Sequence, residues 1–262
     1  MIRGGFGKGL VVFNVAVYVF LLAPIIVIVV SSIGSTGFLR FPPEGFTFRW
    51  YGQALFDPKY AQSLYVSVWV GAVTALMATL VGGSAAVALT RGRLSGKSAV
   101  SSLLMSPLVL PTLVLGVAML LLVSKLRING TIWPLVAAHL VITIPYVLRT
   151  LVPILEHLDP ALEEASADLG ASRMSTFWHV TVPQVRTGVA AGALLAFVIS
   201  FDEVVLALFL TPPGTQTLPM TIYSVVQFAL DPTVAAVASL LLVFTAIVMV
   251  TASKLIGLKR LI

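Results

Sequence analysis

A polar stretch separates two long apolar runs of this chain: residues 156–186 read EHLDPALEEASADLGASRMSTFWHVTVPQVR. It holds five of the chain's ten acidic residues. Asp159 followed by Pro160 is typical of a helix start, because Asp caps free backbone N–H groups and Pro has no N–H to satisfy there. Gly170 is typical of a helix end, and Ser172 can cap a second short helix that ends before Pro183. The stretch therefore predicts two short helices joined by a sharp turn.

The chain around this stretch is strongly apolar. Of its 262 residues 58% are hydrophobic and 10% are charged, and the mean hydropathy is +1.05. Soluble domains carry roughly a quarter charged residues, and about 20 apolar residues are enough for a helix to cross a bilayer. The sequence predicts an all-α membrane protein with one transmembrane domain over residues 1–262. Six spans are expected, at residues 10–33, 63–89, 98–123, 132–155, 187–210 and 233–253.

The basic residues predict the orientation of the chain. With six spans both termini lie on one side of the membrane, and eleven of the 16 Lys and Arg residues fall on that side. Short cytoplasmic loops carry an excess of Lys and Arg. We therefore expect both termini and residues 156–186 in the cytoplasm.

Proline and glycine residues mark places where the spans interact closely. Pro107 and Pro111 interrupt the third span and Pro145 the fourth, which is tolerated where neighbouring helices or a cavity satisfy the freed carbonyl groups. Gly188 and Gly192 form a G-x-x-x-G pair that permits close approach of another helix, within this chain or in a partner. A bundle of helices around a passage is expected.

Groups that could perform bond chemistry are sparse. The chain has no cysteine, and His139, His157 and His179 share no metal-ligand spacing and form no Ser-His-Asp arrangement. Residues 92–98 have three residues between their glycines where a phosphate-binding loop needs four. The basic residues do not alternate with aromatic residues in a polar stripe, as nucleic-acid binding requires. We expect no enzyme, no metal and no nucleic acid.

Two carboxylates, Asp202 and Glu203, lie in the fifth predicted span. A carboxylate at that depth costs about 2 to 3 kcal/mol on insertion scales unless it meets water, a hydrogen-bond donor or a cation. No charged residue occurs in residues 204–230. A water-filled path that admits a cation is one interpretation. The other is that both carboxylates hold helices or subunits together, since intramembrane charges are often paired.

The polar stretch carries a family signature. Glu164-Ala165-Ser166, Gly170 and Val180-Thr181-Val182-Pro183 resemble the E-A-A…G…I-x-L-P signature of binding-protein-dependent ABC importer permeases. The departures are conservative in size, and only Ser166 is expected to modify docking. The likeness extends over nearly the whole chain. It is to the polyamine (spermidine/putrescine) branch of the family, and the residues that carry it are Trp50-Tyr51, residues 107–111, residues 200–203, Leu218-Pro219 and residues 222–224.

This resemblance implies a type I importer permease in the inner membrane of a bacterium. It implies a second permease subunit, two copies of a cytoplasmic ATPase that hydrolyse the ATP, and an extracytoplasmic solute-binding protein. This chain would then need no cofactor of its own. Coupling to the ATPase would fall to Glu164, Ala165, Ser166, Gly170 and Pro183. The path for a polyamine or other organic cation would involve Asp202, Glu203, Tyr223 and Gln227.

Three alternatives stay open at this point. The chain can be an importer permease for another small solute. A secondary transporter or channel would show repeated halves or ionisable relays in several spans, and neither is seen. A membrane scaffold would not need charged residues inside a span. Co-purification with an ATPase would separate the importer from the last two.

Overall fold

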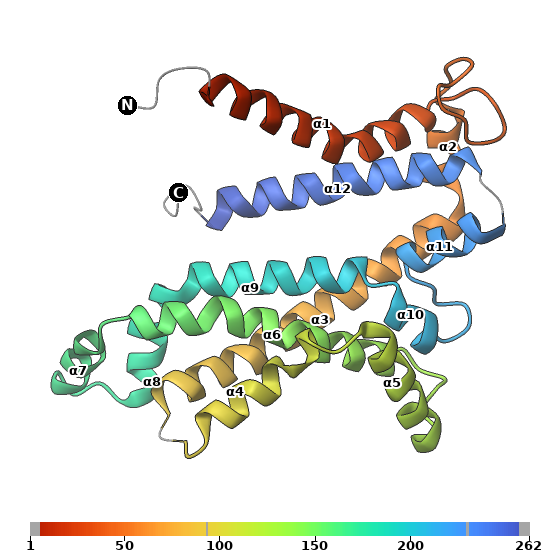
Figure 1. The fold of residues 1–262 in the computed structure, drawn as a ribbon. Helices are drawn as coiled ribbons and strands as arrows, with labels where there is room; N and C mark the ends of the chain where they lie inside the picture. Colours follow the sequence, from red (N-terminus) through yellow and green to blue (C-terminus); the bar gives the residue numbers. More distant parts are fainter. Residues whose placement is uncertain (1–5, 93, 229–230, 257–262) are drawn as a thin grey trace. The chain divides into compact units, whose positions relative to one another are not determined.

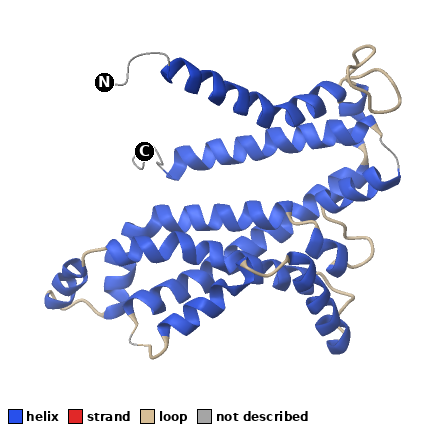
Figure 2. Cartoon of the chain, viewed as in Figure 1, coloured by secondary structure: helices blue, strands red, loops and turns tan. Residues whose placement is uncertain are grey.

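The computed structural model describes residues 6–92, 94–228 and 231–256, and these are nearly all helical (Figure 2). Within the described residues no β-strand occurs, and a single isolated bridge pairs Gly34 with Phe46. The chain falls into two compact units, residues 62–221 with 247–262 and residues 1–61 with 222–246.

The larger unit holds the polar stretch and most of the apolar helices (Figure 1). Its helices are α3 (Pro58–Arg91, with its first residues in the other unit), α4 (Lys97–Met105), η1 (Ser106–Leu108), α5 (Thr112–Leu126), α6 (Trp133–His157), α7 (Pro160–Asp168), α8 (Arg173–Thr176), the π-helical turn η2 (Phe177–Thr181), α9 (Val182–Asp202) and α10 (Val205–Leu210).

Helix α6 lies at the centre of this unit and packs along α9. The G-x-x-x-G pair of α9 makes this close approach possible, because a Cβ atom on Gly188 would collide with Ile154 of α6. A Cβ atom on Gly192 would lie 2.8 Å from the Thr150 hydroxyl oxygen. The predicted close helix contact is therefore confirmed, and it lies within this chain.

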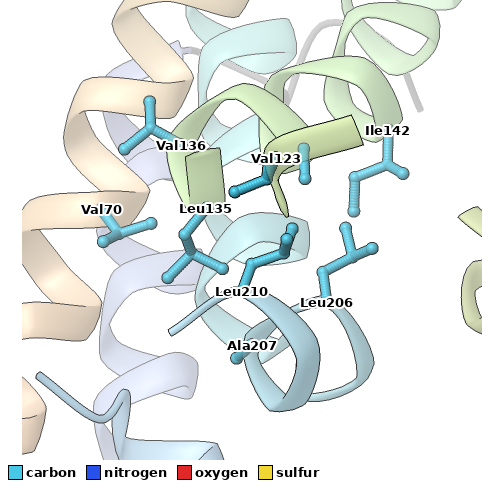
Figure 3. Packing of buried hydrophobic residues seen from close by; sticks show 9 residues of the cluster. Val70, Val123, Leu135, Val136, Ile142, Leu206, Ala207 and Leu210 are labelled. Carbon is cyan, nitrogen blue, oxygen red and sulfur yellow. The ribbon is translucent and has the colours of Figure 1, made fainter. Parts of the chain in front are cut away.

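Two apolar clusters fill the larger unit. The first joins α3, α5, α6 and α10 (Figure 3), through Val70, Val123, Leu135, Val136, Ala138, Ile142, Leu206, Ala207 and Leu210. The second joins α3, α6 and α9, through Ala75, Ala78, Ala86, Val147, Leu148, Leu151, Leu155, Val185 and Ala196. Both α3 and α6 contribute to the two clusters, so these two helices join the apolar core of the unit.

The smaller unit contains α1 (Phe6–Ser31), α2 (Arg49–Phe56) and most of α11 (Leu218–Phe228) and α12 (Pro232–Ile256). The indole N–H of Trp50 donates to the Gly34 carbonyl at 2.7 Å, and the Thr233 hydroxyl donates to Gln53 Oε1 at 3.2 Å. These bonds join α2 to the segment after α1 and to α12. The large apolar side chains of α1 are exposed from Leu10 to Val29, which suits a helix that meets lipid.

Five helices of the described chain are long and apolar enough to cross a membrane. They cover Gly9–Ser31, Pro58–Arg91, Trp133–His157, Arg173–Asp202 and Pro232–Thr251. The bent pair Lys97–Leu108 and Thr112–Leu126 makes a sixth if it is counted as one span.

The third predicted span, residues 98–123, is broken into two helices at its prolines. Its two halves meet at an angle of 100°. Pro107 lies in the short turn η1, and Pro111 has an extended backbone, with ψ of 129°, directly before α5. The two prolines that were expected to interrupt the span therefore turn the chain through a right angle.

The fifth predicted span, residues 187–210, is wrong in its bounds. Helix α9 begins at Val182, continues the helix of α8 and η2, and ends at Asp202. Glu203 and Val204 leave the helix, and α10 starts anew at Val205. Hydropathy depends on composition alone, and residues 205–210 are as apolar as a membrane span. The hydropathy of the sequence therefore does not reveal the break at Glu203 and Val204.

Candidate functional site

Helix α7 has the predicted start and end. Asp159 Oδ1 accepts a hydrogen bond from the Ala161 amide at 3.0 Å. At the other end Gly170 has φ of +85°, and the Ala171 amide donates to the Ser166 carbonyl at 3.1 Å. This left-handed turn directs the chain away from the helix axis at a residue that has no Cβ atom. The first short helix and its glycine stop are confirmed.

The second short helix starts as predicted and ends differently. The Ser172 hydroxyl caps α8 by accepting from the Ser175 amide at 3.2 Å. The helix does not stop before Pro183, because α8 passes through the π-helical turn η2 directly into α9. The Val182 amide donates to the Phe177 carbonyl, five residues back. Pro183 has no N–H to donate, so the change of register just before it loses little hydrogen bonding.

The surface of α7 and its turn is exposed and partly apolar. No residue of α7 is buried, and Glu164 and Ala165 are both exposed. The Ser166 hydroxyl lies 3.0 Å from that of Thr176, which ties α7 to α8. Large apolar side chains are also exposed here: Leu162 at 50%, Leu169 at 89%, Met174 at 66% and Trp178 at 58%. Exposed apolar side chains gathered around a short polar helix are typical of a protein-binding surface.

Glu163 has partners in the chain, whereas Glu164 has none within the described residues. Arg91, the last residue of α3, places its Nε 3.3 Å from Glu163 Oε2 and donates through a terminal nitrogen to the Leu158 carbonyl at 3.3 Å. The Thr181 hydroxyl donates to Glu163 Oε1 at 2.9 Å. No local pattern in the sequence predicts these contacts, because Glu163 and Arg91 lie 72 positions apart.

A cavity of about 760 Å³, called here the cavity behind α7, lies between α7, α8, η2 and the end of α3. It is lined by Val87, Arg91, Gly92, Glu163, Ala167, Ala171, Arg173, Thr176, Phe177 and Thr181. Helix α7 packs against α8 and η2 and is otherwise separated from α3 by this space. A short exposed helix that is held by a few polar contacts can move without disturbing a packed core.

Asp202 and Glu203 lie at the break between α9 and α10. Glu203 Oε1 accepts hydrogen bonds from the Val205 amide at 2.7 Å and the Leu206 amide at 3.1 Å, so this carboxylate caps α10. Asp202 is exposed and has no hydrogen-bond or ion-pair partner among the described residues. The two carboxylates therefore differ in their surroundings: Glu203 caps a helix, and Asp202 is exposed without a partner among the described residues.

Tyr223 and Gln227 belong to α11, in the smaller unit. Both are exposed, and the Gln227 amide nitrogen donates to the Tyr223 hydroxyl at 2.7 Å. The structure thus brings these two predicted site residues together. In the part of the chain that the structure describes, no group of three His, Asp or Glu residues is placed to bind a metal ion.

The chain matches a known protein family over most of its length. Residues 78–257 match the family described as binding-protein-dependent transport system inner membrane component. This match includes the whole of α7, the turn at Gly170 and α9. The chain belongs to this family.

Relatives of this permease match it nearly end to end. It is 36% identical over 257 residues to the spermidine/putrescine transport permease PotC of Escherichia coli K12, covering 98% of this chain and 94% of the relative. It is 34% identical over 235 residues to the putrescine transport permease PotI of the same strain, covering 86% and 82%. The permease is thus homologous to subunits of polyamine ABC importers.

Among solved structures, the permease resembles a chain of a bacterial ABC transporter involved in the import of the acidic polysaccharide alginate. The TM-score is 0.74 with 18% sequence identity, and the match covers 95% of both chains. At this identity the likeness concerns the fold. Together with the family match, it confirms the predicted all-α importer permease.

A polar pair inside the permease was not assigned from the sequence. His139 of α6 is fully buried, and its Nδ1 lies 2.7 Å from the Ser200 hydroxyl of α9. Ser200 lies two residues before Asp202, so this bond joins the end of α9 to α6. Its signal in the sequence was only a lone histidine in an apolar run.

Proposed function

We propose that this permease forms half of the translocation path of an ATP-driven importer and is coupled to a cytoplasmic ATPase through α7 and the turn at Gly170. The observation that carries this proposal is the exposed surface of α7. Glu164 and the large apolar residues around it are exposed, and no residue of α7 is buried. The signature residues Ala165 and Ser166 belong to α7, and Pro183 lies at the start of α9. A partner can shift a conformational equilibrium only if it contacts the two states differently, and a movable helix satisfies this condition.

The assembly proposed around this chain has four further components. They are a second permease subunit, two copies of the ATPase and an extracytoplasmic solute-binding protein. ATP is hydrolysed by the partner, so this chain performs no bond chemistry and binds no cofactor. We place it in the inner membrane of a bacterium, with both termini in the cytoplasm.

We further propose that the solute is a polyamine or another small organic cation. Two permeases with 36% and 34% identity are named for spermidine or putrescine transport, which supports this class. Asp202 supplies an exposed negative charge without a partner among the described residues. Tyr223 and Gln227 are weaker candidates for lining the path. A related permease for another small solute is the second possibility.

Labelling of single cysteines tests the orientation. The natural chain has no cysteine, so variants at Ser35, Ser95 and Leu169, all exposed, each carry one reactive thiol. Ser35 should react with a membrane-impermeant maleimide from outside the cell, and Ser95 and Leu169 only after the membrane is opened. Reaction of Leu169 from outside would contradict coupling to a cytoplasmic ATPase.

Removal of the two carboxylate charges tests the solute class. Asp202→Asn should lower spermidine uptake by about tenfold, equivalent to about 1.4 kcal/mol of lost charge interaction. Glu203→Gln keeps an oxygen that can cap α10, so a smaller loss is expected. Glu44→Gln, an exposed residue of the segment between α1 and α2, serves as control. Normal uptake by Asp202→Asn, or a binding protein that retains only neutral or anionic solutes, would reject the cation proposal.

A further inference from the structure

The contacts of Glu163 join three elements that meet around the cavity behind α7. Its Oε2 lies 3.3 Å from Arg91 Nε at the end of α3, and its Oε1 accepts from Thr181 at 2.9 Å in η2, directly before α9. One carboxylate therefore connects α7 with the ends of α3 and α9. Charge-assisted hydrogen bonds of this kind are about twice as strong as neutral ones.

This connection is important because the other contacts of α7 are chiefly with α8 and η2. None of its residues is buried, and a cavity of about 760 Å³ separates it from the end of α3. The second side-chain link is the bond between Ser166 and Thr176, which reaches only α8. The direct side-chain route from α7 to α3 is the Glu163–Arg91 pair, and Arg91 also donates to the Leu158 carbonyl just before α7.

The surroundings favour a stable link rather than a loose surface pair. The side chains of Arg91 and Glu163 are 24% and 26% exposed, and Thr181 is buried. By comparison the Arg40–Glu44 pair has 52% and 55% exposure, in the range where ion pairs contribute little. Partial burial reduces screening by solvent and salt, so the Glu163 pair is stronger.

The turn that carries Thr181 is itself unusual. η2 is a π-helical turn inside an otherwise continuous helix from Arg173 to Asp202. π-helical turns are rare and occur frequently at functional sites, and a helix can change its hydrogen-bond register at such a place. Glu163 thus holds α7 to the π-helical turn of this long helix.

We propose that Glu163 is a positioning residue that transmits displacement of α7 to α3 and α9, with Arg91 and Thr181 as its receiving partners. This inference rests on the proposed coupling function and deepens it. Glu164 would contact the ATPase, whereas its neighbour Glu163 would pass the movement into the membrane bundle. The two adjacent carboxylates therefore have separate tasks.

Hydrogen exchange in the complete importer tests this division. The purified complex is compared with and without ATP plus vanadate, and exchange is followed in α7, at the end of α3 and in η2. In the unmodified complex all three segments should respond to nucleotide. In Glu163→Gln we expect α7 to respond as before, while the response at the end of α3 falls by about tenfold. Glu44→Gln, which breaks the exposed pair, should change none of these responses.

Exchange of the two charges completes the design. Arg91→Glu alone should lose the response at α3, and Arg91→Glu together with Glu163→Arg should regain part of it, because the pair is restored in reverse. A normal response at α3 in Glu163→Gln would overturn the inference, as would loss of the ATPase from that variant, which would place Glu163 in docking. Absence of any response in α7 of the unmodified complex would instead reject the coupling function itself, and the inference with it.

Discussion

Gly170→Val is expected to abolish solute uptake while the transmembrane bundle remains folded. Gly170 has φ of +85°, a conformation that costs an ordinary residue about 1 to 2 kcal/mol and that a β-branched residue rarely adopts. No atom lies within 4 Å of the position of an added Cβ atom, so the substitution makes no clash inside the chain. Its effect is therefore to redirect the turn that presents α7. Uptake and the amount of folded protein in the membrane are the quantities to measure.

Two further variants separate the turn from general backbone strain. Gly96 has φ of +77° and is equally free of neighbours, and it lies between α3 and α4 on the same predicted side of the membrane. Gly96→Val should therefore carry the same conformational cost and retain uptake. Gly170→Asn should retain a substantial part of it, because Asn tolerates the left-handed conformation. Equal uptake by the two valine variants would show that the turn at Gly170 has no part in coupling.

Glu164→Lys is expected to release the ATPase from the purified complex. Glu164 is exposed and has no partner among the described residues, so its carboxylate is available to a basic group of the ATPase. Hydrogen bonds to charged groups contribute about 1.5 to 3 kcal/mol, and reversal of the charge adds repulsion. The retained ATPase should fall by about tenfold or more.

The matched control is Glu156→Lys. Glu156 is also an exposed carboxylate, but it lies in the last turn of α6 and outside α7. The same change of charge there should leave both ATPase and uptake close to normal. If Glu156→Lys and Glu164→Lys lose the ATPase to the same extent, the attraction is a general one for negative charge and not a contact of α7.

Local signals in the sequence predict the shape of α7 and of the turn at Gly170 well. Asp159, Gly170 and Ser172 act through hydrogen bonds to residues within five positions, and each was placed correctly. The small residues Gly188 and Gly192 also behave as expected, because a close helix contact depends chiefly on their size. The caps and the glycine turn depend on residues within one or two turns, and the glycine pair is recognisable from its four-residue spacing although its contacts are with α6.

The features that were missed depend on distant residues or on continuity between elements. The Arg91–Glu163 pair requires α3 and α7 to meet, which no local pattern reveals. Pro183 predicts a helix boundary, but the helix continues through the π-helical turn before it. Glu203 was read as a charge within a span, whereas it caps the start of α10 after the span has ended. Hydropathy cannot separate these cases because it records composition and not hydrogen bonding.

The subunit content of the importer, purified through a tag on this chain in mild detergent, tests coupling to an ATPase most directly. We predict that the unmodified chain brings with it a second permease subunit and two copies of an ATPase. In the same preparation, a single cysteine at Leu169 should form a cross-link to that ATPase, because this side chain is 89% exposed beside the turn. A folded chain that purifies from the membrane with no ATPase, and whose Leu169 variant cross-links to none, would contradict the proposed function.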